Sequence, residues 1–225
     1  MILWLLPWGG SKHKSLRYIH NRLGKEGYKF EVIPSEEVPL ILPELKVISD
    51  EWLNDKKAGE KGFSLGFFNE EYLSCFPVAV VRFQGRIFAF ANLWPGGGKK
   101  ELSIDLMRYC NDAPHGIMDF IFCEIMLWGK SQGYQWFSLG MVPLAGLEPG
   151  KAASFWSNIG TFVYRHGEHF YNFKGLRSYK DKFDPQWQPR YLASPGSLRL
   201  PSIFTNLTAL IGGSLKDVFT KQPHD

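Results

Sequence analysis

Three charged residues near the middle of the chain have types and spacing that suit the binding of charged groups and proton transfer. Asp105 and Arg108 lie in a segment that alternates like a strand, and Asp119 follows at the start of an apolar helix. A strand that leads into a helix N-terminus makes an anion site, because unpaired backbone N–H groups point outward there. Asp105 alternates with Ile104 and Leu106, so we expect its carboxylate to face away from both and to bind an amine or accept a proton.

Each of these residues also has a structural interpretation, which the sequence leaves open. Asp105 and Arg108 could form a local ion pair at a strand edge. Asp119 falls in the first turn of its helix, where a carboxylate stabilises the helix dipole. His115, between the strand and the helix, is expected to serve the turn.

A second candidate site is the basic and aromatic stretch from Arg165 to Arg190. Lys174, Arg177 and Lys180 are spaced three residues apart and would line one side of a helix. Basic groups interleaved with stacking rings suit a single-stranded nucleic-acid end or a phospholipid head group. An amphipathic helix with an aromatic core and a charged exterior would give the same composition.

Several other kinds of site are disfavoured. The chain has no GxSxG, HExxH or P-loop motif. Its three cysteines show no CxxC pairing, which argues for a reducing compartment and against a disulfide framework or a zinc site. The net charge of +4, from 26 basic and 22 acidic residues, is too small to identify a nucleic-acid partner by itself.

The elements that must position these residues follow from apolar periodicity and turn signals. Helices are predicted at 11–26, 44–57, 117–132, 152–164 and 173–183, and strands at 29–33, 78–83, 86–93, 101–107, 136–139 and 190–193. Prolines at positions 34, 39 and 43 are expected to break the chain, and Gln84-Gly85 predicts a hairpin. The apolar run from Ile2 to Trp8 is far shorter than the ~20 residues that span a bilayer. This order indicates a mixed α/β domain with a sheet covered on at least one face.

Seven sequence blocks occur in the same order as in one protein family. They are KGFSLGFF (61–68), FPVAVVR (76–82), FAFANLW (88–94), ELSIDLMRY (101–109), APHGIMDFIF (113–122), MLWGKSQGYQWFSLGMVPLAGLE (126–148) and NFKGLRSYKDKFDPQWQPRYLA (172–193). From about residue 11 to residue 193, the chain closely resembles the cytoplasmic catalytic region of the bacterial phosphatidylglycerol lysyltransferases and their alanyl-transferring relatives.

The resemblance implies a GNAT-like acyltransferase fold, in the α/β (α+β) class, with a central, mostly antiparallel sheet flanked by helices. It also implies that aminoacyl-tRNA donates lysine, favoured here over alanine, to a glycerol hydroxyl of phosphatidylglycerol at the cytoplasmic face of the bacterial cell membrane. Such transfer makes the membrane less anionic and gives resistance to cationic antimicrobial peptides. We expect a division of the chain into the end of a preceding repeat or a linker with a basic helix (1–44), a catalytic domain (45–195) and a C-terminal tail (196–225). Because the large N-terminal membrane region usual in the family is missing from the sequence, we expect a fragment or a truncated relative.

With this reaction in view, the candidate residues take specific roles. Asp105 is expected to hold the ammonium of the donor amino acid, Arg108 a phosphate, and Asp119 to orient a group or accept a proton. The phosphate-binding candidates of the tRNA end or the lipid are Lys174, Arg177, Lys180 and Arg190. The basic helix at 11–26 and the tail at 198–219 are expected to attach the domain to an anionic bilayer, although the tail could instead pack on the body.

No metal and no cofactor is expected, and coenzyme A least of all. Coenzyme A-dependent relatives of the fold carry a loop of the form R/Q-x-x-G-x-G/A, whose backbone cradles a pyrophosphate. The corresponding turn, from Arg108 to Gly116, lacks this glycine spacing, and Pro114 removes an N–H donor. Two alternatives stay open: transfer of the same donor to a cell-wall peptide or other amine, and a non-catalytic module that binds tRNA or the membrane.

Overall fold

The computed structural model describes residues 2–4, 13–55, 66–142 and 173–190, with four further positions near the C-terminus. The strands are β1 (Ile2–Trp4), β2 (Lys29–Ile33), β3 (Val78–Phe83), β4 (Arg86–Pro95), β5 (Glu101–Tyr109) and β6 (Trp136–Ser138). The helices are α1 (Lys14–Glu26), α2 (Val38–Asp55), α3 (Glu70–Leu73), α4 (Ile117–Ser131) and α6 (Phe173–Asp181), with a short 3-10 turn at Gly97–Lys99.

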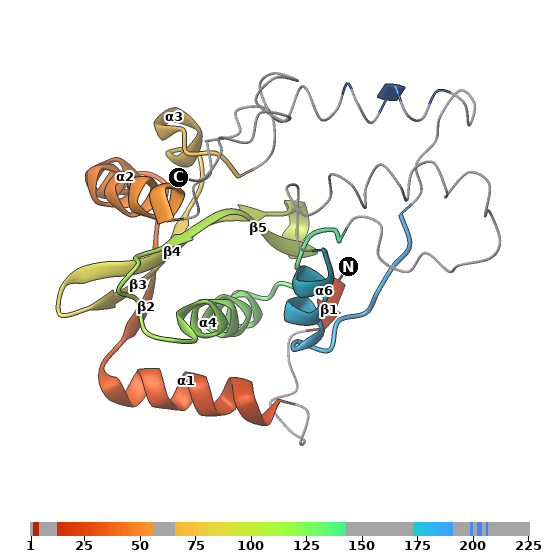
Figure 1. The fold of residues 1–225 in the computed structure, drawn as a ribbon, viewed down its shortest axis with the longest axis horizontal. Helices are drawn as coiled ribbons and strands as arrows, with labels where there is room; N and C mark the ends of the chain where they lie inside the picture. Colours follow the sequence, from red (N-terminus) through yellow and green to blue (C-terminus); the bar gives the residue numbers. More distant parts are fainter. Residues whose placement is uncertain are drawn as a thin grey trace, which may run out of the picture. The chain divides into compact units, whose positions relative to one another are not determined.

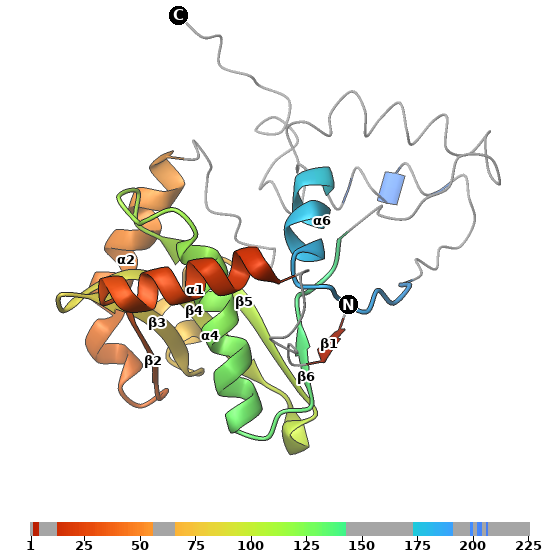
Figure 2. The same cartoon turned by 90° about the horizontal axis from the view of Figure 1, so that it is seen from below.

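The strands form one mixed sheet in the order β1-β6-β5-β4-β3-β2 (Figure 1). Neighbouring strands are antiparallel except β5 and β6, which run parallel and are joined through α4. Helices α2 and α3 cover one face, and α4 covers the other with α1 packed on it (Figures 1 and 2). This confirms the predicted α/β (α+β) class, a mostly antiparallel sheet flanked by helices.

The hairpin between β3 and β4 forms where the sequence predicts it. Gln84 and Gly85 both have positive φ angles, 50° and 85°, as a two-residue turn between twisted strands requires. Strand β3 is buried from Val78 to Val81, and β4 is buried along most of its length. Both strands of the hairpin therefore lie inside the sheet, between β5 and β2.

Helix α4 is buried on most sides, as its nearly all-round apolar sequence predicts. Gly116 precedes it with a φ of 89°, and a Cβ atom there would lie 2.8 Å from the side chain of Ile19 in α1. Only glycine allows this close approach without displacing α1. The carbonyl of His115 also accepts a hydrogen bond from Arg22 of α1 at 2.5 Å, so the turn before α4 is tied to α1.

Helix α2 starts earlier than predicted. The expectation of a break at the prolines placed its start at residue 44, but α2 begins at Val38 and contains Pro43. Proline lacks an N–H and normally disfavours a helix interior. Burial of Val38, Leu42 and Leu45 against the sheet offsets that cost, so packing decides the conformation.

The chain divides into two compact units, which differ from the expected domains. The first comprises residues 1–60, 64–140 and 182–187, and the second comprises 61–63, 141–181 and 188–225. The expected boundary at 44/45 falls inside α2, and β2 pairs with β3 in the same sheet as the other strands. The predicted helix at 152–164 and most of the strand at 190–193 and the tail lie outside the described residues.

Among the described residues, no helix is both long enough and apolar enough to cross a membrane.

Candidate functional site

The site is built around an irregularity in β5. Ala91 of β4 pairs with Met107, and Leu93 pairs with Ile104, so Asp105 and Leu106 together oppose a single residue of β4, Asn92. This is a β-bulge, which locally reorients side chains. Asn92 is fully buried, and its Oδ1 accepts a hydrogen bond from the Leu106 backbone N–H at 2.7 Å. The side chain of Asn92 thus satisfies a backbone group that the bulge leaves out of the ladder.

Next to the bulge, β5 separates from β6. The pairing of these strands runs from Glu101 opposite Trp136 to Ser103 opposite Ser138. Within the described part of the chain, β5 continues from Ile104 onward without a partner on this side. Among the described residues, no strand covers the edge of β5 beside Asp105.

Asp105 is held by a tyrosine from α3. The hydroxyl of Tyr72 donates a hydrogen bond to Asp105 Oδ2 at 2.9 Å. Burial raises the pKa of Tyr72 to about 12, with a further contribution from the Asp105 hydrogen bond, while Asn92 and Trp94 act in the opposite direction. The phenol therefore remains a neutral donor, and the carboxylate keeps acceptor positions for another group.

Arg108 lies on the same face of the sheet as Asp105. Its guanidinium is 4.2 Å from the ring centre of Trp52 in α2 and donates through Nη2 to the carbonyl of Gly66 at 3.1 Å. Nη1 donates to the Met107 carbonyl at 2.9 Å. The hydrogen-bond partner of Asp105 among the described residues is instead Tyr72. The structure therefore brings Asp105 and Arg108 to one face without using one to neutralise the other.

One expectation about this strand was wrong. Asp105 was expected to face away from both Ile104 and Leu106, but Leu106 packs in the apolar cluster with Leu42 and Leu45 of α2, on the face that carries Asp105. The bulge is the reason, because it shifts the alternation of the strand by one residue.

Asp119 lies on the other face of the sheet, in the first turn of α4 (Figure 1). Its carboxylate is buried and forms a salt bridge with Lys182 at 3.1 Å. The structure therefore does not bring Asp119 to the face that carries Asp105. The role of orienting group or proton acceptor stays a prediction.

The basic residues of the second candidate site have different surroundings. Arg177 of α6 faces Asp181 at 3.8 Å, and Arg190 is exposed. Lys180 is buried and its Nζ donates to the Met141 carbonyl at 3.3 Å. Burial lowers the pKa of Lys180 to about 8. Lys174 belongs to the same helix, but its side chain is outside the described part.

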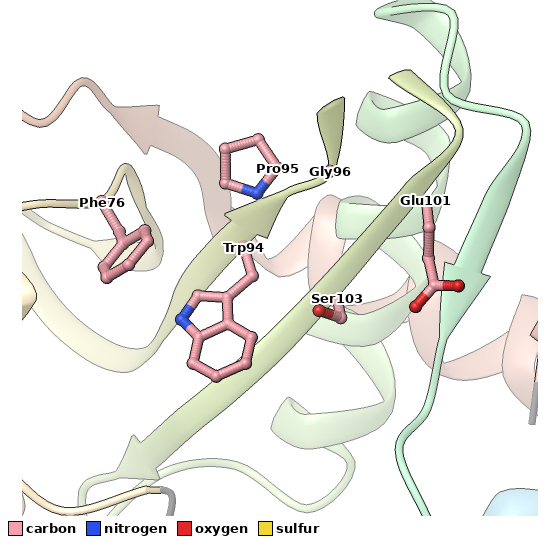
Figure 3. Close-up of a pocket in the computed structure, with 6 residues that line it drawn as sticks. All are labelled: Phe76, Trp94, Pro95, Gly96, Glu101 and Ser103. Atoms are coloured by element: carbon pink, nitrogen blue, oxygen red, sulfur yellow. The ribbon is translucent and has the colours of Figure 1, made fainter. Parts of the chain in front are cut away.

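A cavity of about 300 Å³ lies farther back along β5 on the Asp105 face. Figure 3 shows the residues that line it, which are Phe76, Trp94, Pro95, Gly96, Glu101 and Ser103. The rings of Tyr72 and Phe76 are 5.2 Å apart and those of Phe76 and Trp94 are 6.1 Å apart, so an aromatic wall connects the cavity to Asp105. No group of three or more His, Cys, Asp or Glu side chains within the described ranges is arranged to hold a metal ion.

The family model for the C-terminal region of phosphatidylglycerol lysyltransferase matches residues 6–194. The chain belongs to this family.

Individual relatives agree with this membership. The chain is 44% identical over 211 residues to a phosphatidylglycerol lysyltransferase of Bacillus subtilis, which covers 92% of this chain and 24% of that protein. It is 36% identical over 184 residues to a phosphatidylglycerol lysyltransferase of Staphylococcus xylosus, covering 81% and 22% respectively. The structure of L-PGS from Bacillus licheniformis superposes with a TM-score of 0.82 at 41% identity, covering 94% of this chain and 65% of that one. The chain thus spans about a quarter of the length of these curated relatives.

In this member of the phosphatidylglycerol lysyltransferase C-terminal family, sequence reasoning missed the residues that position the two charges. Tyr72 and Trp52 contact Asp105 and Arg108 from separate helices, and Asn92 supports the bulge from the next strand. The alternation of Glu101, Ser103 and Asp105 along β5 is a sequence signal for a polar side of that strand, but it does not identify Tyr72, Trp52 or Asn92.

Proposed function

We propose that this chain carries out tRNA-dependent aminoacyl transfer, moving lysine from lysyl-tRNA to a glycerol hydroxyl of phosphatidylglycerol at the cytoplasmic face of the membrane. The observation that carries the proposal is the Asp105 carboxylate, held by a neutral donor just beyond the point where the β5–β6 pairing ends, in a family named for this reaction. Reduction of membrane negative charge, with resistance to cationic antimicrobial peptides, would follow from the product.

Aminoacyl transfer requires a site that binds the ammonium of the amino acid and a site that stabilises the oxyanion developing at the attacked carbonyl. A glycerol hydroxyl attacks the ester carbonyl, the bond from that carbonyl to the tRNA ribose oxygen breaks, and the proton of the hydroxyl passes to the departing ribose oxygen. Asp105 binds the free α-ammonium of the aminoacyl group through a charge-assisted hydrogen bond. Arg108 lies on the same face and is fixed by Trp52 and Gly66, which suits it to hold a phosphate of the donor or of the lipid.

The turn before α4 argues against coenzyme A as the carrier of the transferred acyl group. The N–H of Ala113 bonds to the Cys110 carbonyl and that of Ile117 to the Pro114 carbonyl, both at 3.1 Å, so these donors are already used within the turn. Asp112 adds a carboxylate there, paired with Arg86 at 2.7 Å. A pyrophosphate needs free N–H groups and no nearby negative charge.

Phosphate contacts of the tRNA end or the lipid are assigned to the basic residues of the α6 region. Lys174, Arg177 and Lys180 lie in one helix and Arg190 follows it. With a pKa of about 8, Lys180 is mostly protonated at neutral pH and can serve as a phosphate ligand. Each phosphate contact contributes nearly one unit to the log–log salt dependence of binding to duplex RNA.

The test is to incubate the chain with labelled lysyl-tRNA and phosphatidylglycerol vesicles. Lipid-extractable label supports the proposal, and Asp105→Asn should abolish it because the amide accepts the Tyr72 hydrogen bond but carries no charge. Asp50→Asn is the matched control, since Asp50 pairs with Lys46 on the exposed side of α2. Water-soluble label on an added amine would indicate the peptide-directed transferase instead. Binding of tRNA or vesicles without any transfer would indicate a non-catalytic module.

A further inference from the structure

The cavity beside Trp94 contains polar groups that the fold does not use. Within the residues that the structure describes, the Glu101 carboxylate and the Ser103 hydroxyl take part in no hydrogen bond or ion pair. Figure 3 shows the Ser103 side chain between those of Trp94 and Glu101. A carboxylate at the mouth of an aromatic cavity is a typical arrangement for a cationic ligand, since ring faces and carboxylates both attract ammonium groups.

The position of Glu101 is fixed by the backbone. The Gly96 N–H donates to the Glu101 carbonyl at 2.8 Å, and a Cβ atom at position 96 would overlap that carbonyl oxygen. On the other side, Glu101 pairs with Trp136 of β6. The carboxylate therefore starts from a rigid strand, although the side chain itself is exposed.

We infer that this cavity receives the side chain of the donor lysyl group and that Glu101 binds its terminal ammonium, which makes Glu101 a residue that selects lysine over alanine. The inference rests on the proposed aminoacyl transfer and assigns the amino acid specificity of the same site. The aromatic wall through Tyr72 and Phe76 would contact the methylene groups between the two ammonium ends.

The spacing along β5 supports this assignment. Glu101 and Asp105 are four positions apart along β5. At a strand rise of about 3.3 Å per residue, their Cα atoms are separated by roughly 13 Å. The two ammonium nitrogens of an extended lysyl group are joined by six covalent bonds of about 1.5 Å each, which span roughly 7.5 Å. One charge-assisted hydrogen bond of about 2.8 Å at each end extends this to roughly 13 Å. The two carboxylates can therefore hold both ends of one lysyl group.

Other occupants fit less well. The methyl group of an alanyl donor does not reach Glu101 and leaves the cavity unfilled. A lipid or tRNA phosphate is repelled by the Glu101 carboxylate. A neutral sugar would gain no charge-assisted contact there.

The test compares two small ligands that differ only at the end of the side chain. Dissociation constants of lysine methyl ester and of the methyl ester of 2-aminoheptanoic acid, in which a methyl replaces the terminal ammonium, are measured by NMR titration of the full chain. We expect the lysine ester to bind about tenfold more tightly, as one charge-assisted hydrogen bond implies. Glu101→Gln should bring the ratio near one, and Glu101→Lys should invert it. Asp105→Asn should weaken the binding of both esters by similar factors, so the ratio of their dissociation constants should not change.

Glu37→Gln, at an exposed glutamate just before α2, is the matched control and should keep the ratio of the unmodified chain. An unchanged ratio in both Glu101 variants, with folded proteins by circular dichroism, overturns the inference. Equal binding of the two esters to the unmodified chain overturns it as well. If the ratio depends on Glu101 but no transfer occurs from lysyl-tRNA, the subsite stands and the proposed function fails. If transfer occurs without dependence of the ratio on Glu101, the proposed function stands and the subsite fails.

Discussion

The hydroxyl of Tyr72 donates to the carboxylate of Asp105 over 2.9 Å, although the two residues are 33 positions apart in the sequence. Tyr72 is itself fixed by its helix, because the side chain of Asn69 caps α3 and accepts a hydrogen bond from the Tyr72 N–H at 2.7 Å. The orientation of the central carboxylate thus depends on the cap of a four-residue helix.

Tyr72→Phe removes this hydrogen bond and keeps the ring. We expect transfer from lysyl-tRNA to fall about tenfold, because the carboxylate loses the donor that orients it, and the free energy of unfolding to fall by about 1 kcal/mol. Initial transfer rates and urea unfolding measure the two effects. Full activity in the variant would show that Asp105 does not need Tyr72 for its orientation.

The pKa of Lys180 predicts how the stability of the chain changes in alkaline solution. Burial lowers it to about 8 from 10.5, so between these values the unfolded chain binds more protons at this site than the folded chain. The free energy of unfolding contributed by Lys180 should therefore rise from pH 8 to pH 10.5, and the burial penalty should be fully present below pH 8. Lys180→Met should lack this rise in urea unfolding across that range. Lys25→Met, at an exposed position of α1, is the control, and an identical pH profile for both variants would contradict the prediction.

The pair formed by His20 and Glu124 is expected to stabilise the chain more at low pH than at high pH, which is the opposite of the trend expected for Lys180. The imidazole and the carboxylate are 2.7 Å apart between α1 and α4, and this hydrogen bond raises the pKa of His20. The stabilisation is fully present below the ordinary histidine pKa of about 6.5 and is lost as pH rises through the higher pKa of the folded state. Glu124→Gln should therefore cost about 1 kcal/mol at about pH 5.5 and much less at about pH 8.5. Equal losses at the two pH values would mean that the charged form of His20 makes no special contribution.

Variants of the Asp119–Lys182 ion pair can distinguish a structural role of Asp119 from a functional one. Lys182→Met and Asp119→Asn should each destabilise the chain, and the double variant should lose about 0.5–1 kcal/mol less than the sum. Urea unfolding of the four proteins gives this coupling, and additive losses would argue against the ion pair. A loss of transfer in Asp119→Asn that Lys182→Met does not share would assign the carboxylate the orienting role predicted from the sequence.

Local sequence signals predicted most of the sheet. The Gln84-Gly85 turn, the apolar runs of β3 and β4 and the apolar faces of α4 were sufficient, because burial and turn conformation act over a few residues. Helix α3 was missed, since four residues give no periodicity, and the start of α2 was missed because packing of Leu42 and Leu45 overrides Pro43. Only the charged residues of the site could be predicted from the sequence, because the residues that position them are brought in by packing. Asp105 and Arg108 are identifiable as charges in an apolar strand, whereas Tyr72, Trp52 and Asn92 reach them through tertiary contacts.

The bulge opposite Asn92 makes the site sensitive to the pairing register of β5 as well as to its composition. Asp105 and Arg108 are three positions apart, and in an uninterrupted strand an odd interval sends two side chains to opposite faces. The extra residue restores them to a shared face. If β5 paired with β4 without the bulge, every residue after Asp105 would shift by one position in register, which would turn Arg108 away from Trp52 and Leu106 out of the core together. Loss of the bulge is therefore equivalent to several simultaneous substitutions, and the pairing register of β5 belongs to the recognition chemistry as much as the charges do.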